Sequence, residues 1–188
     1  MPALDRVAIA RARRRTRVTR LLVVVLAPVA AWAGVAGGAL SGPGAAGAAV
    51  VTGQGFDAVV DGHRSWYGSY LLGDLGEVWC VDHGIRAPDA DLGYEPTGLD
   101  DRAPETRRAV AWAVGRHGPG ADRVGAAALM LALHDLMGAA YPSGPLSVDG
   151  LEPSSLAGFE GREGEVLDRA RRIRADAVAH AGLVGPLA

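Results

Sequence analysis

Residues 126–133 read Ala-Ala-Ala-Leu-Met-Leu-Ala-Leu, and as a helix this run is apolar on every side. The run lies inside a longer helical segment that starts near Asp122 and ends at Gly138. A helix that is apolar all round is buried inside a domain, because none of its faces suits water. We therefore predict a buried central helix over about 122–137, around which the other elements pack.

A second helix is predicted before this segment, over about 104–117. Pro104 suits the first turn of a helix, and Asp100 or Asp101 is the expected cap. Glycines on both sides of Pro119 end the helix. Only a short turn therefore joins it to the central helix.

A third helix is predicted after the central one, over about 163–181. Its apolar residues recur at helical spacing and form one stripe: Val166, Ala170, Ile173, Ala177 and Ala181. This stripe indicates that one face of the helix packs against the core. The segment 139–161, rich in Pro, Gly and Ser, is predicted as the loop between the two helices.

Strands are predicted only before the helices, in a small β region over about 56–82. Three short runs rich in valine and aromatic residues are separated by glycine-containing turns: Phe56–Val60, Trp66–Leu72 and Glu77–Asp82. Residues 42–55 are predicted as an unstructured lead-in, and residues 84–103 as a long loop. These assignments predict an α+β fold in which the β region packs against the three helices.

The first 48 residues have the three-part layout of an export signal. An arginine cluster ends at Arg20, an apolar run over 21–26 follows, and small-x-small sites occur at 31–33 and 46–48. This layout predicts either a cleaved signal peptide over 1–48 or an uncleaved membrane anchor, a helix through 21–40. In both cases residues 49–188 form a single exported α+β domain. We expect the protein to be secreted or held at the extracellular face of the membrane.

The charge of the exported domain argues against a nucleic-acid ligand. All 19 basic residues are arginine; 7 of them lie at or before Arg20, with Asp5 as the only acid among the first 48 residues. The remaining 12 arginines face 20 acidic residues, which gives residues 49–188 a net charge of −8. Phosphate backbones require clustered positive charge. An unknown protein or a cell-wall ligand is therefore the expected partner.

Cys80 is the only cysteine, so it cannot form a disulfide within the chain. In an exported protein, such a residue indicates a disulfide to another chain or a reactive thiol; otherwise it is a small apolar residue of the core. Along a strand, Cys80 shares a face with Val78 and Asp82. The neighbouring carboxylate of Asp82 disfavours a thiolate and so favours the buried interpretation.

Short motifs follow Cys80 in a recognisable order. Trp-Cys-Val-Asp at 79–82 precedes a Pro-containing loop, Ala-Val-Ala-Trp at 109–112 and Leu-His-Asp-Leu at 133–136. Over about residues 65–185 this order resembles the thioester-type domain of Gram-positive cell-surface proteins, particularly its diverged actinobacterial versions. The resemblance implies that Cys80 corresponds to the cysteine of a Cys-Gln internal thioester.

The glutamine that this resemblance requires is missing. In the family it stands at the start of a later helix, where this chain reads Asp-Arg-Val-Gly-Ala-Ala at 122–127. Gln54 is the only glutamine, and it lies before the cysteine in a predicted linker. A thioester requires a carboxamide that the thiolate can attack. The resemblance therefore implies a non-catalytic, adhesin-like binding module that is thioester-domain-like without a thioester.

A thiol hydrolase is the alternative from another class of function. It would need a histidine beside Cys80 and a group that orients this histidine. His134, with Asp135 next to it, is the best candidate, although a histidine there also closes the polar end of a buried helix. His83 is closer in sequence but would point away from Cys80 if the strand continued. We expect no catalysis and keep the Cys80–His134 hydrolase as the alternative.

No metal-binding spacing is present around the 84–103 loop. The nearby histidines and acids match neither a zinc site nor a calcium-binding loop: His63, Asp82, His83, Asp89 and Asp91. An acidic loop of this kind is usually solvated. We therefore expect neither a metal nor a cofactor.

Overall fold

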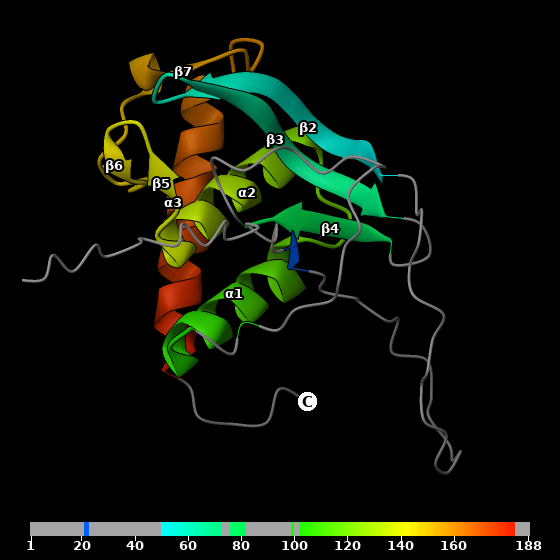
Figure 1. Ribbon diagram of the computed structural model, residues 1–188, viewed down its shortest axis with the longest axis vertical. Helices are drawn as coiled ribbons and strands as arrows, with labels where there is room; N and C mark the ends of the chain where they lie inside the picture. Colours follow the sequence, from blue (N-terminus) through cyan, green and yellow to red (C-terminus); the bar gives the residue numbers. More distant parts are fainter. Residues whose placement is uncertain (1–20, 23–49, 73–75, 82–98, 100–101, 183–188) are drawn as a thin grey trace, which may run out of the picture.

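The computed structural model describes residues 21–22, 50–72, 76–81, 99 and 102–182. In chain order its elements are β1 (Leu21–Leu22), β2 (Val50–Val60), β3 (His63–Leu72), β4 (Glu77–Cys80), α1 (Pro104–His117), α2 (Arg123–Met137), β5 (Ala140–Tyr141), β6 (Gly144–Pro145), the 3₁₀ helix η2 (Pro153–Ser155), β7 (Leu156–Ala157) and α3 (Glu163–Ala181). An antiparallel sheet packs on a layer of helices (Figure 1), so the predicted α+β fold is confirmed.

The predicted export signal over residues 1–48 lies outside the described residues, except for Leu21 and Leu22. These two residues form β1, which pairs with the end of β4. Within the described ranges, no helix is both long and apolar enough to span a bilayer. The signal peptide over 1–48 and the anchor through 21–40 therefore stay predictions.

The sheet has the order β1-β4-β3-β2-β7, and every neighbouring pair is antiparallel. Its centre is the long β2–β3 hairpin, which turns at Asp61 and Gly62. Both turn residues have positive φ, 49° and 75°. That combination matches the right-handed twist of the flanking strands, and Asp-Gly is a preferred sequence for it. The glycine-containing turn that was predicted between the first two strand runs is therefore confirmed.

β2 begins at Val50, six residues earlier than predicted, so residues 50–55 of the expected unstructured lead-in form strand. Val50 pairs with Leu72, and the ladder then shifts register between Thr52 and Gly55. The glycines that suggested a loop instead form this irregular crossing of two strands. β3 likewise starts at His63 instead of Trp66. Residues 82–98, which include most of the predicted 84–103 loop, lie outside the described residues.

The three helices occupy the predicted segments. Asp122 caps α2 by accepting a hydrogen bond from the backbone N–H of Gly125 at 2.7 Å, and Gly138 ends α2 in the left-handed conformation, with a φ of 63°. The cap predicted for α1 was wrong, because the cap position is Ala103 and no side chain bonds there. Pro104 fixes the start of α1 without such a bond.

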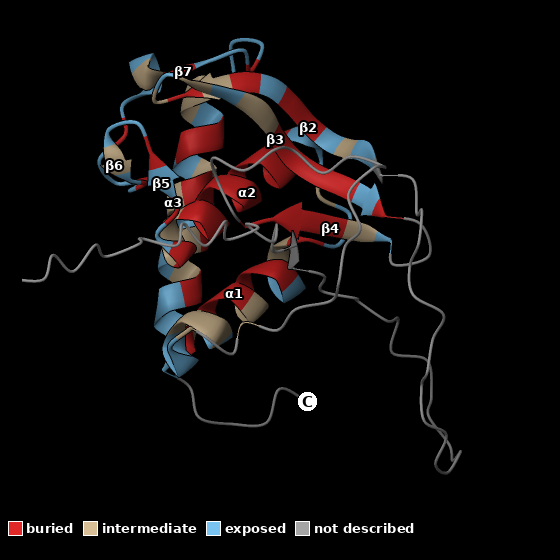
Figure 2. Ribbon diagram, in the orientation of Figure 1, coloured by how far each residue is buried: buried red, intermediate tan, exposed pale blue. Residues whose placement is uncertain are grey.

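α2 is the centre of the core, as its apolar sequence predicted. Residues 124–134 are buried without exception, and Figure 2 shows α2 red between the sheet and the other helices. α3 buries only one side, the predicted stripe with the addition of Leu167. The sheet therefore lies on α2, with α1 and α3 packed around the helix.

The segment 139–161, predicted as a loop, contains regular structure. β5 and β6 form a small hairpin, and β7 joins the main sheet by pairing with Val59 and Val60. Arg171 of α3 fixes the intervening chain by donating to the carbonyl oxygens of Val148 at 3.0 Å and Leu151 at 2.6 Å. Two-residue strands held by a distant arginine leave no periodic pattern, which explains why the sequence showed only a loop.

Candidate functional site

Cys80 is the last residue of β4 and has only 5% of its surface exposed. Val78 and Trp79 before it and Val81 after it are also buried. Both faces of this strand end are therefore covered, as the apolar interpretation of Cys80 expected. Asp82, the predicted neighbour on the same face, lies outside the described residues.

His134 lies beside Cys80 but is bonded to its backbone. Its Nε2 is 3.1 Å from the carbonyl oxygen of Cys80, and its Nδ1 is 2.7 Å from the hydroxyl of Tyr141. The side chain is 1% exposed. His134 thus joins α2 to the end of β4 and to the short hairpin that follows α2.

The partners of the ring fix its tautomer. A carbonyl oxygen can only accept, so Nε2 carries a proton and donates it to the oxygen of Cys80. In the neutral ring Nδ1 is then an acceptor, and Tyr141 donates its hydroxyl proton to it. Both nitrogens are in use in this arrangement. His134 would have to give up one of these bonds to take a proton from the Cys80 thiol.

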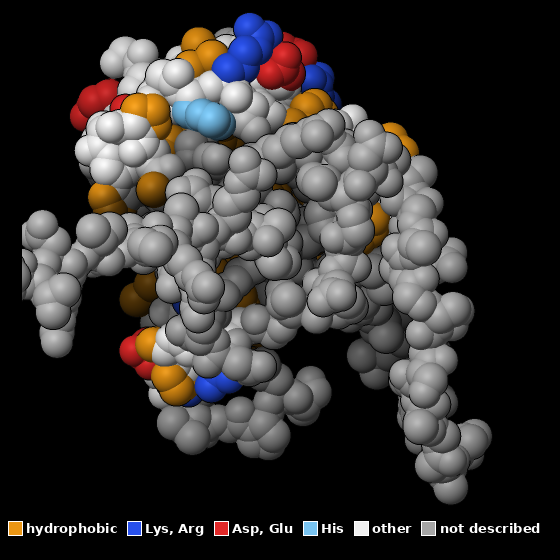
Figure 3. Space-filling view, viewed as in Figure 1, with side chains coloured by type: hydrophobic (Ala, Val, Ile, Leu, Met, Phe, Trp, Pro, Cys, Tyr) orange, Lys and Arg blue, Asp and Glu red, His pale blue; other side chains and the backbone are white. Residues whose placement is uncertain are grey.

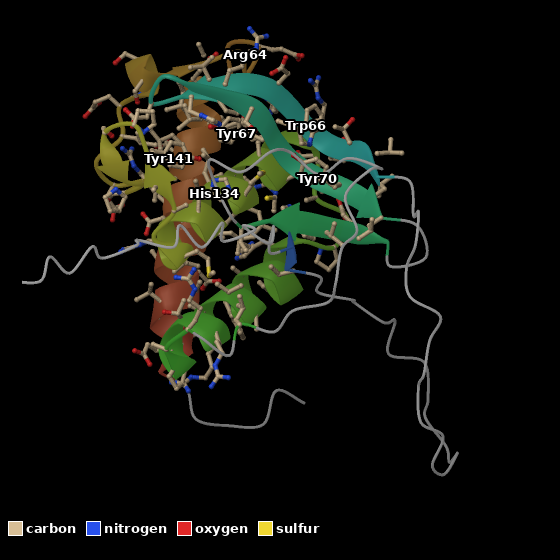
Figure 4. All side chains as sticks on the ribbon, in the orientation of Figure 1. Arg64, Trp66, Tyr67, Tyr70, His134 and Tyr141 are labelled. Carbon is tan, nitrogen blue, oxygen red and sulfur yellow. The ribbon has the colours of Figure 1, made fainter. Side chains whose placement is uncertain are left out.

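Two tyrosines lie beside this histidine in the core. Tyr67 of β3 is fully buried, lies next to Tyr141, and donates to the carbonyl oxygen of His63 at 3.3 Å. The rings of Tyr67 and His134 meet edge to face at 6.5 Å. Figure 4 labels Tyr67, His134 and Tyr141 close together between sheet and helices. We call Tyr67, Tyr141, His134 and the Cys80 carbonyl the buried polar chain.

Burial keeps both tyrosines of the buried polar chain protonated. It raises the pKa of Tyr67 to about 12, with a smaller contribution from the negative charge of Asp61. Burial also raises the pKa of Tyr141 far above its ordinary value, and the nearby Tyr67, Cys80 and Asp61 add to the effect. Neither hydroxyl is therefore a base at neutral pH; each serves as a hydrogen-bond donor.

These raised pKa values predict alkaline unfolding. A raised folded pKa contributes stability that is complete below the ordinary tyrosine value of about 10 and lost as pH rises through the folded value. We expect Tyr67 and Tyr141 to stay protonated at about pH 11 in the folded protein. Tyrosinate absorbance, recorded with circular dichroism, should show their ionisation only together with unfolding. Ionisation of all 4 tyrosines near pH 10 with the fold intact would contradict this assignment.

Asp135 does not orient His134, although the two are adjacent in sequence. One carboxylate oxygen of Asp135 accepts from the backbone N–H of Val148 at 2.8 Å, and the other is 3.3 Å from Nε of Arg174. Arg174 also reaches Asp149 at 3.3 Å. Asp135 therefore fastens the 139–161 segment to α2 and α3, and it is not placed to act as the acid of a Cys-His-Asp arrangement.

Gln54 cannot reach Cys80 as the acyl donor of a thioester. Gln54 lies in β2 with an exposed side chain, whereas Cys80 is buried in β4. β3 runs between these strands, so their backbones are about 10 Å apart at the usual strand spacing. The predicted linker position of Gln54 was wrong, because its backbone N–H donates to the Ser69 hydroxyl at 3.1 Å within the hairpin.

The residues weighed as metal ligands do not form a described site. His83, Asp89 and Asp91 lie outside the described residues, as Asp82 does. The His63 ring meets the Tyr141 ring edge to face at 6.3 Å. Among the residues that the structure describes, no three histidine, cysteine or acidic side chains gather in a way that could hold a metal ion.

A second polar cluster joins α1 to α3 and was not predicted. The indole N–H of Trp112 donates to Asp176 at 2.9 Å, and Nε2 of His117 is 3.2 Å from the same oxygen. The His180 ring stacks on Trp112 at 3.9 Å, with an angle of 7° between the rings. These contacts hold the ends of two helices together. The hydrogen bond from Trp112, followed by that from His117, holds the pKa of Asp176 below its ordinary value.

The lowered pKa of Asp176 predicts a stability difference that depends on pH. A depressed folded pKa contributes stability above the unfolded value of about 3.9, and the contribution is lost as pH falls through the lower folded value. We expect Asp176→Asn to lower the urea midpoint clearly at pH 6 and only slightly below about pH 3. Glu152→Gln, at an exposed acid elsewhere, is the control and should change neither midpoint. An equal loss at both pH values would contradict the assignment.

The chain matches no protein-family model, no curated protein and no solved structure. The chemistry of the site therefore has to be read from its own residues. The structure brings Cys80 and His134 together through a backbone carbonyl, and it adds Tyr67 and Tyr141. An aromatic residue in a β region, such as Tyr67, usually signals packing, and Tyr141 lay in a predicted loop, so the sequence offered no signal that would have selected these two tyrosines.

Proposed function

We propose that this chain is an exported, non-catalytic binding module, thioester-domain-like without a thioester. One observation carries the proposal: both ring nitrogens of His134 are used in the buried polar chain, one of them by the backbone of Cys80. A general base for the thiol needs a ring nitrogen within reach of the sulfur. The geometry supports a role for His134 in holding β4 on α2.

The proposed ligand is a protein or a cell-wall polymer outside the cell. The net charge of −8 over residues 49–188 suits a soluble exported domain and disfavours nucleic acid. In Figure 3, arginine and acidic side chains lie side by side at the top of the view. Arg64 and Asp57 form an exposed ion pair with 3.0 Å between their side-chain atoms. A surface of mixed charge fits a polar ligand better than a lipid membrane.

Export is tested by the amino terminus of the protein that leaves the cell. Signal cleavage should yield a terminus just after residue 33 or residue 48, at the small-x-small sites. An uncleaved anchor should instead yield the full chain in the membrane fraction, with residues 49–188 removed by protease added outside intact cells. Full-length, protease-protected protein in the cytosol would contradict the proposal.

Binding and catalysis are separated by two variants of the exported protein. Cys80→Ala and His134→Gln should retain binding to isolated cell walls or to immobilised extracellular-matrix proteins, in proportion to the fraction that stays folded. Neither variant nor the wild type should hydrolyse a chromogenic ester or a fluorogenic peptide. Hydrolysis by the wild type that both variants lose would establish the alternative, a thiol hydrolase using Cys80 and His134.

The missing thioester is tested by intact mass. Formation of an internal thioester expels ammonia and lowers the mass by about 17 Da. We expect the exported protein to have the unmodified mass of its sequence. A deficit of about 17 Da that disappears in Cys80→Ala would show that a thioester forms after all.

A disulfide from Cys80 to another chain, the remaining sequence prediction, would require this side chain to become accessible. In the full-length chain, where Leu21 of β1 pairs with Cys80, the residue is 5% exposed and its sulfur is shielded. Non-reducing electrophoresis of the exported protein distinguishes the two cases. We expect a single band at the position of the reduced protein.

A further inference from the structure

The outer edge of β2 is only partly covered. β7 pairs with β2 at Val59 and Val60 alone, and the described part of the chain provides no other strand on that side. Figure 1 shows β7 at one end of the hairpin, with β2 continuing beyond it. An uncovered strand edge offers backbone groups to any other strand that approaches.

Arg123, near the start of α2, lies across this edge. Its Nε donates to the carbonyl oxygen of Gly55 at 3.1 Å, in the middle of β2. Its other two nitrogens bind both carboxylate oxygens of Glu160, at 3.0 and 2.8 Å. Its guanidinium also lies 4.2 Å from the centre of the Phe56 ring. Three contacts thus fix one side chain where a neighbouring strand would otherwise run.

The partner of Arg123 is held in place by an unusual backbone. Glu160 has a φ of 58°, a conformation that residues other than glycine rarely adopt. The turn around it brings Gly158 against β2: a Cβ at Gly158 would lie 2.9 Å from the carbonyl oxygen of Asp57. Among the residues that the structure describes, Arg123 and this turn cover the edge of β2 except at residues 50–54.

The open stretch has the properties of a self-pairing strand. Residues 50–54 read Val-Val-Thr-Gly-Gln and carry no charge, so two copies can approach without repulsion between like charges. Val51 is 55% exposed, and Leu71, which pairs with it in β3, is 46% exposed. An antiparallel pair of identical strands about a twofold axis is self-complementary.

We propose that Arg123 blocks the outer edge of β2, and that without it this edge pairs with β2 of a second copy of the chain. With Arg123 in place, an incoming strand could pair with only the few residues before the Gly55 carbonyl. Removing the side chain exposes that carbonyl and frees the edge toward Asp57. This proposal concerns self-association and does not depend on what the domain binds.

Sedimentation velocity of Arg123→Ala over a range of concentrations tests the proposal. Arg169→Ala is the matched control, because Arg169 also bonds a carboxylate at the start of α2, that of Asp122 at 3.0 Å. We expect Arg123→Ala to self-associate at least about tenfold more tightly than the wild type and Arg169→Ala. A folded Arg123→Ala that sediments like the wild type at every concentration would overturn the proposal.

A rescue variant identifies the strand that pairs. Val51→Lys places a charge on the open edge, which disfavours strand pairing. Added to Arg123→Ala, it should restore the wild-type sedimentation, whereas a dimer that persists would overturn pairing through β2. If Arg123→Ala fails to fold, Glu160→Gln weakens the same block while keeping the arginine. It should then raise self-association by a smaller factor, and the absence of any rise would likewise overturn the proposal.

Discussion

Replacing Gly68 by alanine should destabilise the domain severely, by about 4 kcal/mol or more. Gly68 of β3 and Gly55 of β2 face each other where the two strands cross closely. A Cβ at Gly68 would lie 2.1 Å from the carbonyl oxygen of Gln54 and 2.6 Å from the Cα of Gly55. Both of these close contacts are with backbone atoms, so the clash can be relieved only if the two strands of the hairpin move apart. Thermal unfolding should show a fall in Tm of roughly 10 °C.

The control for this substitution is Gly115→Ala in α1. Nothing lies within 4 Å of a Cβ at that exposed position. Alanine favours a helix over glycine, so Gly115→Ala should raise stability by about 0.5–1 kcal/mol. A Gly68→Ala variant that melts within about two degrees of the wild type would show that the strands do not cross as closely as described.

Replacing His134 by leucine should cost about 3–5 kcal/mol of the free energy of unfolding. Leucine can neither donate to the Cys80 carbonyl nor accept from Tyr141, and both groups are buried. Tyr141→Phe removes only one of these bonds and should cost about 1–3 kcal/mol. Urea unfolding of the two single variants and the double variant measures the coupling between the residues.

The direction of the stability change in His134→Leu separates a structural histidine from a catalytic one. Catalytic residues are often neutral or costly for stability, so replacing one tends to leave the fold unchanged or more stable. In the buried polar chain the double variant should cost clearly less than the sum of the single variants, because both remove the same hydrogen bond. A fully stable His134→Leu would contradict the structural role and support the hydrolase.

The helices could be predicted from the sequence because each one carries its own signal. α2 is apolar on every side over 126–133, and α3 has a continuous stripe from Val166 to Ala181. Such patterns repeat within a few residues and need no knowledge of distant contacts. The boundaries of α1 and α2 followed from glycine, proline and Asp122.

The missed features depend on contacts between residues far apart in the chain. Residues 50–55 form a strand only because β3 lies beside them, and their glycines suggested a linker. Tyr141 was passed over because its partner Tyr67 lies in β3, far away in the sequence. His134 was selected because it lies in the central helix with Asp135 beside it, but its bond is to a backbone atom of Cys80 that sequence patterns cannot specify. The structure therefore brings the candidate pair together, and the hydrolase alternative stays a prediction.

The central claim is that Cys80 and His134 meet as structural residues, and the rate of Cys80 alkylation tests it most directly. Iodoacetamide reacts with the thiolate, so the rate between pH 5 and 8 reports both burial and activation by a neighbouring base. We expect the folded wild type to react far more slowly than a small-molecule thiol throughout this range, and His134→Gln to react faster because the fold loosens around the sulfur. A wild-type thiol that reacts rapidly even at pH 5, and that slows when His134 is replaced, would contradict the account.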